Sequence, residues 1–279
     1  MLSNPSLTLE NGVEIPQLGL GLWQVDPALT KGVVTTALEL GYRHFDTAQM
    51  YGNEAGVGAA VEASGLPRDE LFITSKLNNN RHDPAAARDS FDRTLEALRT
   101  DYVDLFLIHW PLPGVGDFVE TWHALEDVYE SGRARAIGVS NFLEPHLERL
   151  MAESGVVPAV NQIEIHPYLT QGPLRAYDAD HGIVTEAWSP LGSGIVLDDP
   201  VLARIGAAHG VTPAQVTIRW HLQRGDVVFP KSTHRERLAQ NLDVFGFTLS
   251  DADIAAIDAL NRDQRTGPDP ATFNWVPRG

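Results

Sequence analysis

Short apolar runs alternate along the chain with longer stretches in which apolar residues recur every three or four positions. The runs have the length and composition of buried β-strands, and several are apolar on both faces, as strands of a parallel sheet are. The longer stretches have the periodicity of helices that pack on a sheet. We expect strands at residues 17–21, 42–46, 71–76, 103–109, 135–140, 159–164, 183–188 and 227–231.

Local signals support helices between these strands. Residues 26–27 and 83–84 are each an aspartate followed by a proline, which is typical of an N-cap and the first helical position. Two further helical stretches, at residues 200–209 and 250–259, are additional to the alternation. The pattern therefore predicts an α/β fold, a (β/α)₈ TIM barrel with two extra helices, and we expect residues 1–279 to form one domain.

Glycines mark features outside this repeat. Residues 7–15 alternate around Asn11-Gly12, a turn pair favoured where both positions need positive φ, so we expect a β-hairpin that caps one end of the barrel. The strings GLGLW at 19–23 and GVGAA at 56–60 are not dinucleotide-binding fingerprints, because neither opens a helix after a strand with all three glycines. We interpret their glycines as packing positions.

Charge and composition exclude several classes of function. The 279 residues carry a net charge of −16, which would repel a phosphate backbone, so we expect no nucleic-acid partner. The absence of cysteine excludes disulfides, thiolate nucleophiles and thiolate-bound metals. No run of 18 apolar residues indicates a membrane span, and the first residues do not resemble a signal peptide. We therefore expect a cytoplasmic protein.

Four polar residues follow the ends of predicted strands: Asp46, Tyr51, Lys76 and His109. In a parallel barrel all strands end on one face, and that face carries the active site. Singly, each residue is explained by a helix cap, a solvated strand end or ordinary packing. Together on one face they predict a site that donates a proton to a carbonyl oxygen.

The chemistry of such a site follows from the residue types. A tyrosine is a weak acid near neutral pH, and a nearby ammonium such as Lys76 would lower the pKa of Tyr51. Asp46 would keep Lys76 charged and oriented, and His109 would donate a hydrogen bond to the substrate oxygen. None of these groups supplies a hydride, so the site needs a cofactor.

These motifs resemble the aldo-keto reductase superfamily. The stretch GYRHFDTAQMYGNEAGVG at 41–58 resembles the family's first signature, and FPKSTHRERLAQN at 229–241 resembles its last. GVSNF at 138–142, NQIEIHP at 161–167 and WSPLGSG at 188–194 fall where the family binds its cofactor. The resemblance covers nearly the whole chain and is nearest to the bacterial branch that includes 2,5-diketo-gluconate reductases.

The resemblance implies roles for individual residues. Tyr51 would be the general acid, and Trp188 would stack on the nicotinamide ring of NADPH. Residues that would hold the nicotinamide carboxamide are Ser140, Asn141 and Gln162. Residues that would follow the pyrophosphate are Ser189, Leu191 and Ser193. Residues of the last signature, near the adenosine phosphate, are Lys231, Ser232, Thr233, Arg237, Gln240 and Asn241.

The residues themselves also support a phosphate site after the last strand. Lys231 and Arg237 form a basic cluster in an acidic chain, where a short helix begins, and helix N-termini with cations suit a phosphate dianion. This favours NADPH over NADH, although relatives often carry arginine and glutamate where this chain has His234 and Gln240. A solvated helix face is the other interpretation of the cluster.

The substrate pocket is expected from resemblance to lie among Trp23, Asn78, Trp110 and Trp275. Packing of barrel-end loops is an equally good explanation of Trp23 and Trp110. Asn78 stands where many relatives have tryptophan, so we expect a more polar pocket that suits a hydroxylated or keto-sugar substrate.

The leading interpretation is an NADPH-dependent reductase of small aldehydes and ketones, including dicarbonyls and keto-sugar acids, that acts as a monomer. A second is an NADP(H)-binding regulatory or redox-sensing protein with little turnover. A third is a metal-dependent isomerase or hydrolase using Glu164, His166 and Glu186, although Lys76 would place an uncompensated positive charge near the metal. We expect no bound metal.

Overall fold

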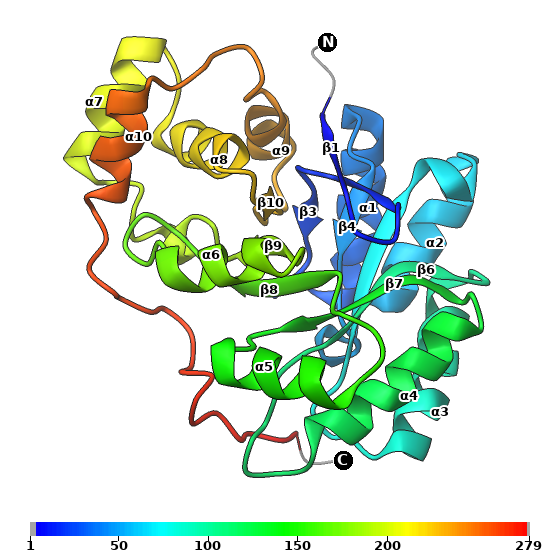
Figure 1. Cartoon of the computed structure of the whole chain (residues 1–279). Coiled ribbons are helices and arrows are strands. Elements are labelled where there is room, and N and C mark those ends of the chain that lie inside the picture. Colours follow the sequence, from blue (N-terminus) through cyan, green and yellow to red (C-terminus); the bar gives the residue numbers. More distant parts are fainter. Residues whose placement is uncertain (1–3, 278–279) are drawn as a thin grey trace.

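The computed structural model describes residues 4–277 of the chain. Its centre is an eight-stranded parallel sheet in which the strands follow one another in sequence order (Figure 1). The strands are β3 (Leu20–Gly21), β4 (His44–Asp46), β5 (Phe72–Leu77), β6 (Val103–Ile108), β7 (Ala134–Ser140), β8 (Val160–Glu164), β9 (Val184–Trp188) and β10 (Val227–Val228). All eight predicted strands are present, with ends that shift by a few residues.

The sheet closes on itself between its first and last strands. A parallel bridge joins Leu18 to Val228, and the backbone N–H of Gly19 donates to the carbonyl of Val228 over 2.8 Å. The approach is close at β3, where a Cβ at Gly21 would lie 2.5 Å from the carbonyl oxygen of Phe229. Glycine is therefore required at this seam, as its interpretation as a packing residue predicted. The predicted (β/α)₈ barrel is confirmed.

Helices surround the strands, and their starts agree with the local signals. They are α1 (Pro27–Leu40), α2 (Glu54–Ser64), α3 (Pro84–Leu98), α4 (Phe118–Glu130), α5 (Glu144–Glu153), α6 (Gly172–Asp180), α7 (Pro200–His209), α8 (Pro213–Gln223), α9 (Arg235–Leu242) and α10 (Asp251–Asp258). The side chain of Asp26 accepts the N–H of Ala28, and that of Asp83 accepts the N–H groups of two residues in the first turn of α3. The extra helices predicted at 200–209 and 250–259 are α7 and α10.

The apolar core has two layers that follow from the alternation of side chains along each strand. Residues such as Ile73 and Phe106 pack outward against the helices. Their neighbours Phe72, Leu105 and Val160 belong to a separate cluster with the hairpin, inside the barrel. Side chains that share the inward direction therefore meet within the barrel, and this positions the site.

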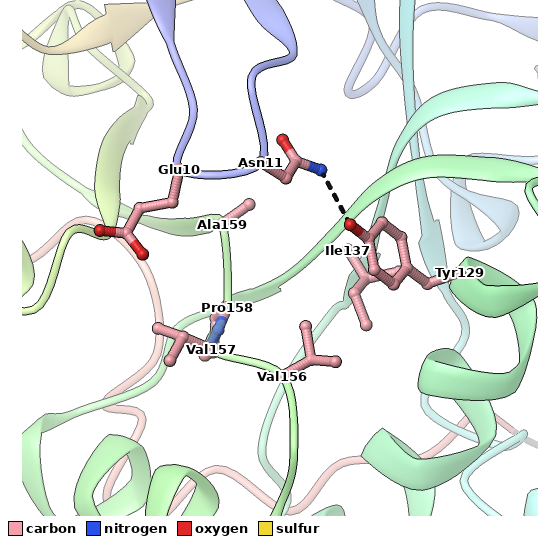
Figure 2. A pocket seen from close by; sticks show the side chains of 8 residues that line it. All are labelled: Glu10, Asn11, Tyr129, Ile137, Val156, Val157, Pro158 and Ala159. Carbon is pink, nitrogen blue, oxygen red and sulfur yellow. Dashed lines mark hydrogen bonds between the residues drawn. The ribbon is translucent and has the colours of Figure 1, made fainter.

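The N-terminal hairpin, β1 (Ser6–Thr8) and β2 (Glu14–Pro16), covers the end of the barrel where the strands begin. Its tip docks through the side-chain amide of Asn11, which donates to the carbonyl of Arg135 over 2.8 Å and lies 3.5 Å from the Tyr129 hydroxyl (Figure 2). A cavity of about 40 Å³ lies beneath the tip, between the hairpin and Val156. The hairpin was predicted correctly, but its turn was not: only Gly12 of the turn pair has positive φ, at 82°.

The C-terminal segment follows α10 and runs back along the molecule to the far end from the hairpin (Figure 1). Glu164 at the end of β8 accepts the N–H and the hydroxyl of Thr266, both over 2.6 Å, and the N–H of Gly267 over 3.2 Å. Asn79 donates to the carbonyl of Trp275 over 2.9 Å. The segment thus contacts the loops that follow β5 and β8. Within residues 4–277, the helices are too short or too polar to cross a membrane.

Candidate active site

Three of the four candidate catalytic residues share the inward direction at the ends of adjacent strands. Asp46 ends β4, Lys76 lies near the end of β5, and His109 follows β6. Side chains alternate between the two faces of a strand, so residues an even number of positions apart share a face. Lys76 shares the inward face with Phe72 in β5, and His109 shares it with Leu107 in β6. Tyr51 comes from the short 3₁₀ helix η1 (Gln49–Tyr51) that follows β4. The structure brings all four residues together.

Lys76 is the centre of this group. Its side chain is fully buried, and its Nζ donates to Asp46 Oδ1 over 2.7 Å, to the Thr47 carbonyl over 2.9 Å and to the Tyr51 hydroxyl over 3.3 Å. Burial lowers the pKa of Lys76, but Asp46, through its charge and its hydrogen bond, and Tyr51 outweigh burial, so the net pKa is raised. The ammonium therefore persists inside the barrel. Sequence reasoning missed the Thr47 carbonyl, since no pattern marks one backbone group.

Tyr51 differs from expectation in the direction of its pKa. Burial raises the pKa of the phenol more than the Lys76 ammonium lowers it. The prediction of a net lowered value is therefore wrong, because the cost of forming a phenolate away from water was not included. The neutral phenol keeps its proton at neutral pH, and Lys76 lies where it would stabilise the anion left after that proton is donated.

His109 lies beside the phenol, with its ring 5.7 Å from the Tyr51 ring in an edge-on arrangement. Burial lowers the pKa of His109 well below its usual value, and the charges of Lys76 and His82 lower it further. The imidazole is therefore neutral at physiological pH. Its Nδ1 is buried without a hydrogen-bond partner among the described residues. A neutral imidazole carries one N–H donor, which suits recognition of an uncharged oxygen.

Gln162 connects this group to the next strands. Its Nε2 donates to Asp46 Oδ2 over 2.9 Å and to Glu186 Oε2 over 2.7 Å. Glu186 lies on β9 and is fully buried. Sequence reasoning considered Glu186 only as a metal ligand. Its inward position, two residues before Trp188, was the available signal.

A second cluster lies at the ends of β7, β8 and β9. Asn141, in a left-handed conformation with φ of 65°, donates to the Ser140 hydroxyl over 3.0 Å. Its Oδ1 accepts the indole N–H of Trp188 over 2.8 Å. A Cβ at Gly267 would lie 2.4 Å from the Trp188 ring, so the C-terminal segment packs against the indole. The three residues expected near the carboxamide, Ser140, Asn141 and Gln162, therefore lie side by side with Trp188.

The two phosphate segments follow β9 and β10. In the first, Ser189 and Ser193 have φ of 47° and 54°, and Leu191 lies between them. In the second, α9 begins at Arg235 as expected, and Lys231 and Arg237 form no ion pair with residues 4–277. Other residues of this segment are Ser232 and Asn241, which are buried, and Thr233 and Gln240, which are exposed.

Of the four expected substrate residues, Trp23 contacts Tyr51 directly. The Trp23 ring lies 4.9 Å from the Tyr51 ring and is half exposed. Trp110 is buried against Phe273 of the C-terminal segment at 4.3 Å, so its packing role is substantial. Trp275 is exposed, and Asn78 Oδ1 is buried without a partner among the described residues. Phe273 was missed, because its contact joins distant parts of the chain.

The metal interpretation finds no geometric support. Glu164 pairs with His166 at 3.1 Å and is otherwise occupied by the C-terminal segment, whereas Glu186 is bonded to Gln162. No group of three or more histidine, aspartate or glutamate side chains in residues 4–277 is arranged to hold a metal ion.

A buried lysine and carboxylate beside a partly exposed phenol, at the end of a closed parallel barrel, define a site suited to carbonyl chemistry. The sequence model of the Aldo/keto reductase family matches residues 17–262. An aldo-keto reductase of Mycolicibacterium smegmatis is 51% identical over 98% of this chain and 99% of its own. The methylglyoxal reductase DkgA of Yersinia pestis is 46% identical, with the same coverage. A Gox0644 variant in complex with NADPH has a TM-score of 0.94 and 46% identity over 98% of this chain and 100% of that chain.

The chain therefore belongs to the aldo-keto reductase family. It is an NADP(H)-dependent oxidoreductase that acts on carbonyl groups.

Proposed function

We propose that the protein reduces small aldehydes and ketones to alcohols with NADPH, and that Tyr51 is the general acid. The observation that carries this proposal is the contact of one buried ammonium, Lys76 Nζ, with both the Asp46 carboxylate and the Tyr51 hydroxyl. A phenol held against a cation can release its proton to a nearby oxygen, because the resulting phenolate is stabilised where it forms.

The roles of the other residues follow from their positions. NADPH, when bound, supplies the hydride for the carbonyl carbon. His109 donates a hydrogen bond that holds the carbonyl oxygen near Tyr51, and its neutrality lets it do so without adding charge beside Lys76. Asp46 balances the Lys76 charge. Phe273 of the C-terminal segment packs on the buried Trp110, the residue that follows His109.

The residues of the second cluster fit the cofactor. Ser140 and Asn141 use their donors within the protein and keep acceptor oxygens where the N–H of a carboxamide would bind. Trp188 presents a partly exposed indole for the nicotinamide ring. Lys231, which precedes α9, and Arg237, in its first turn, form no ion pair with residues 4–277, and they suit the 2′-phosphate of NADPH. Ser189, Leu191 and Ser193 would follow the pyrophosphate between these two ends.

The substrates we propose are small dicarbonyls and hydroxylated carbonyl compounds. A relative that is 46% identical is named a methylglyoxal reductase, which supports the dicarbonyls. Hydroxylated substrates are supported by the loop after β5, where Asn78 Oδ1, Asn79 Oδ1 and Asn80 Oδ1 are buried without partners among the described residues. Unpaired buried oxygens are unfavourable, so hydroxyl donors of a ligand would stabilise them.

The test is the loss of absorbance at 340 nm with NADPH, and separately with NADH, against methylglyoxal, aromatic aldehydes and a diketo sugar acid. We expect turnover with NADPH that exceeds turnover with NADH. Tight NADPH binding without turnover on any of these compounds would contradict the proposal.

The polar pocket has its own test. In Asn78→Trp we expect lower activity on hydroxylated ketones but not on aromatic aldehydes, because an indole cannot replace the amide. Unchanged relative rates would contradict the assignment of Asn78.

A further inference from the structure

One buried acid to which the mechanism gives no role lies next to a proposed cofactor residue. Glu186 lies inside the barrel on β9, and its side chain is fully buried. Its Oε2 accepts a hydrogen bond from Gln162 Nε2 over 2.7 Å, and its Oε1 is buried without a partner among the described residues. A buried polar group with one hydrogen bond is unfavourable for stability. Its position next to a proposed cofactor residue indicates that the acid acts on Gln162.

The two hydrogen bonds of Gln162 fix which end of its amide faces inward. A side-chain amide has two N–H donors on its nitrogen and only acceptor capacity on its oxygen. The two oxygens that face this amide, from Asp46 and Glu186, both accept hydrogen bonds from its nitrogen. A flipped amide would set its own oxygen against the Asp46 carboxylate and would lose the hydrogen bond that Glu186 Oε2 accepts, so the pair favours the orientation with nitrogen inward. The carbonyl oxygen Oε1 of Gln162 then faces away from them.

We propose that Glu186 is a positioning residue that, together with Asp46, orients the Gln162 amide so that its carbonyl oxygen accepts the N–H of the nicotinamide carboxamide. This inference rests on the proposed placement of Gln162 at the cofactor. Asp46 alone supplies one acceptor, which leaves the amide free to rotate about that hydrogen bond. The second acceptor, on the neighbouring strand, removes this freedom.

The charge of Glu186 is compatible with this role. Burial raises the pKa of Glu186 to about 8, and the charge of Asp46 adds to the rise, whereas Gln162 and Lys76 oppose it. At neutral pH the acid is therefore uncharged. It offers Gln162 an acceptor oxygen without adding a second negative charge beside the Asp46–Lys76 pair, so the charge balance around Tyr51 is preserved.

The test compares three probes that share the adenosine end of the cofactor. They are NADP⁺, its 3-acetylpyridine analogue, and 2′,5′-ADP. The analogue keeps the carbonyl of the carboxamide but lacks its N–H, so it cannot donate to Gln162. Loss of one hydrogen bond weakens binding by about five-fold, and we expect that ratio of Kd values between the analogue and NADP⁺ in the wild-type protein.

The variants are Glu186→Leu, which removes the acceptor at similar volume, and Glu186→Gln, which keeps an acceptor oxygen. We expect Glu186→Leu to bring the ratio close to one and Glu186→Gln to keep the wild-type ratio. Affinity for 2′,5′-ADP should stay unchanged in both, because this probe has no nicotinamide. It also reports that the variants are folded. Glu186→Met, with its adaptable side chain, replaces the leucine variant if that variant does not fold.

The outcomes separate this inference from the proposed function. A wild-type ratio of one would overturn the placement of Gln162 at the carboxamide, and this inference with it. A wild-type ratio near five that persists in Glu186→Leu would overturn the positioning role alone. A merely structural role would lower the melting temperature of Glu186→Leu without changing the ratio, and that result also counts against the proposal.

Discussion

The buried carboxylates at the two ends of the barrel have different kinds of partner. At the end covered by the hairpin, Asp104 accepts from Arg68 over 2.7 Å, from Arg135 over 2.8 Å and from the N–H of Ile73 over 2.9 Å. At the other end, Asp46 shares Lys76 with the hydroxyl of Tyr51. One aspartate binds two arginines that do nothing else in the proposed chemistry, whereas the other is part of a group that must change protonation.

The polar groups near Asp46 and near Asp104 differ in the same way. At the catalytic end, buried side-chain atoms without partners among the described residues include Asn78 Oδ1, His82 Nε2 and His109 Nδ1. Both carboxylate oxygens of Asp104 are hydrogen-bonded at the hairpin end. Unpaired buried groups destabilise a fold unless a ligand or water satisfies them. The fully bonded Asp104 therefore serves stability, whereas the unpaired groups near Asp46 have the capacity to bind a ligand.

The largest expected effect is on turnover, from a change at the catalytic end. Tyr51→Phe removes the proposed acid, and we expect kcat to fall by roughly 10²- to 10⁴-fold while the Kd for NADPH is retained. Tyr129→Phe is the matched control, since its hydroxyl lies beside Asn11 at the hairpin end. It should keep wild-type turnover. Steady-state kinetics at saturating NADPH would measure both, and a Tyr51→Phe enzyme at the wild-type rate would show that the acid is another group.

At the hairpin end we expect the reverse result, a loss of stability with turnover retained. Asp104→Ala leaves Arg68 and Arg135 without their anion, and breaking such a buried pair costs about 3 kcal/mol of unfolding free energy. Turnover per folded molecule should stay near wild type. Asp92→Ala removes an exposed pair with Arg133 and should cost less than about 1 kcal/mol. Urea unfolding measures the free energy of both variants. Equal losses in Asp104→Ala and Asp92→Ala would mean that burial does not determine how much an ion pair contributes to stability.

Sequence reasoning predicted features that local rules determine. The eight strands, the aspartate-proline helix starts and the helices α7 and α10 follow from periodicity and capping, which operate within a few residues. The meeting of Asp46, Lys76 and His109 follows from the topology of a parallel barrel. These predictions needed no knowledge of which side chains pack together.

Most of the missed features depend on burial or on contacts between distant segments. The raised pKa of Tyr51 reflects the loss of water around the phenol, which no spacing reveals. Phe273 packs on Trp110, and Asn79 bonds to the carbonyl of Trp275, across more than half the chain. The turn at Gly12 differs because the two-residue and three-residue hairpin loops share the same sequence signal.

A smaller effect is expected at the phosphate segment, where Lys231 and Arg237 form no ion pair with the described part of the chain. Lys231→Gly combined with Arg237→Ala should raise the KM for NADPH by about ten-fold or more, because charged hydrogen bonds contribute about 1.5–3 kcal/mol each. The KM for NADH should change little, since NADH lacks the 2′-phosphate. Arg235→Ala is the control within the same helix, as Arg235 pairs with Glu39. Equal effects on both cofactors would place the 2′-phosphate elsewhere.

The smallest expected effect is on the pH dependence of stability, and it comes from a third buried carboxyl. Asp178 is fully buried like Asp104, but it accepts only from the Asn161 amide and the Thr185 hydroxyl and forms no ion pair with residues 4–277. Burial raises the pKa of Asp178 to about 7. An unfolded aspartate has a pKa of about 3.9, so between these values the unfolded chain binds fewer protons than the folded one. The contribution of Asp178 to stability therefore decreases as pH rises from about 4 to about 7.

Asp178→Asn removes this titration, because an amide stays neutral. Relative to wild type, the variant should gain roughly 1–3 kcal/mol of unfolding free energy between pH 4.5 and pH 8, with most of the gain reached by pH 7. Asp69→Asn, at an exposed position, should show no such change. Urea unfolding at pH 4.5, 6 and 8 would measure the difference. A constant difference between variant and wild type across this range would mean that Asp178 is ionised in the folded protein, and that two hydrogen bonds without a cation suffice to hold a buried charge.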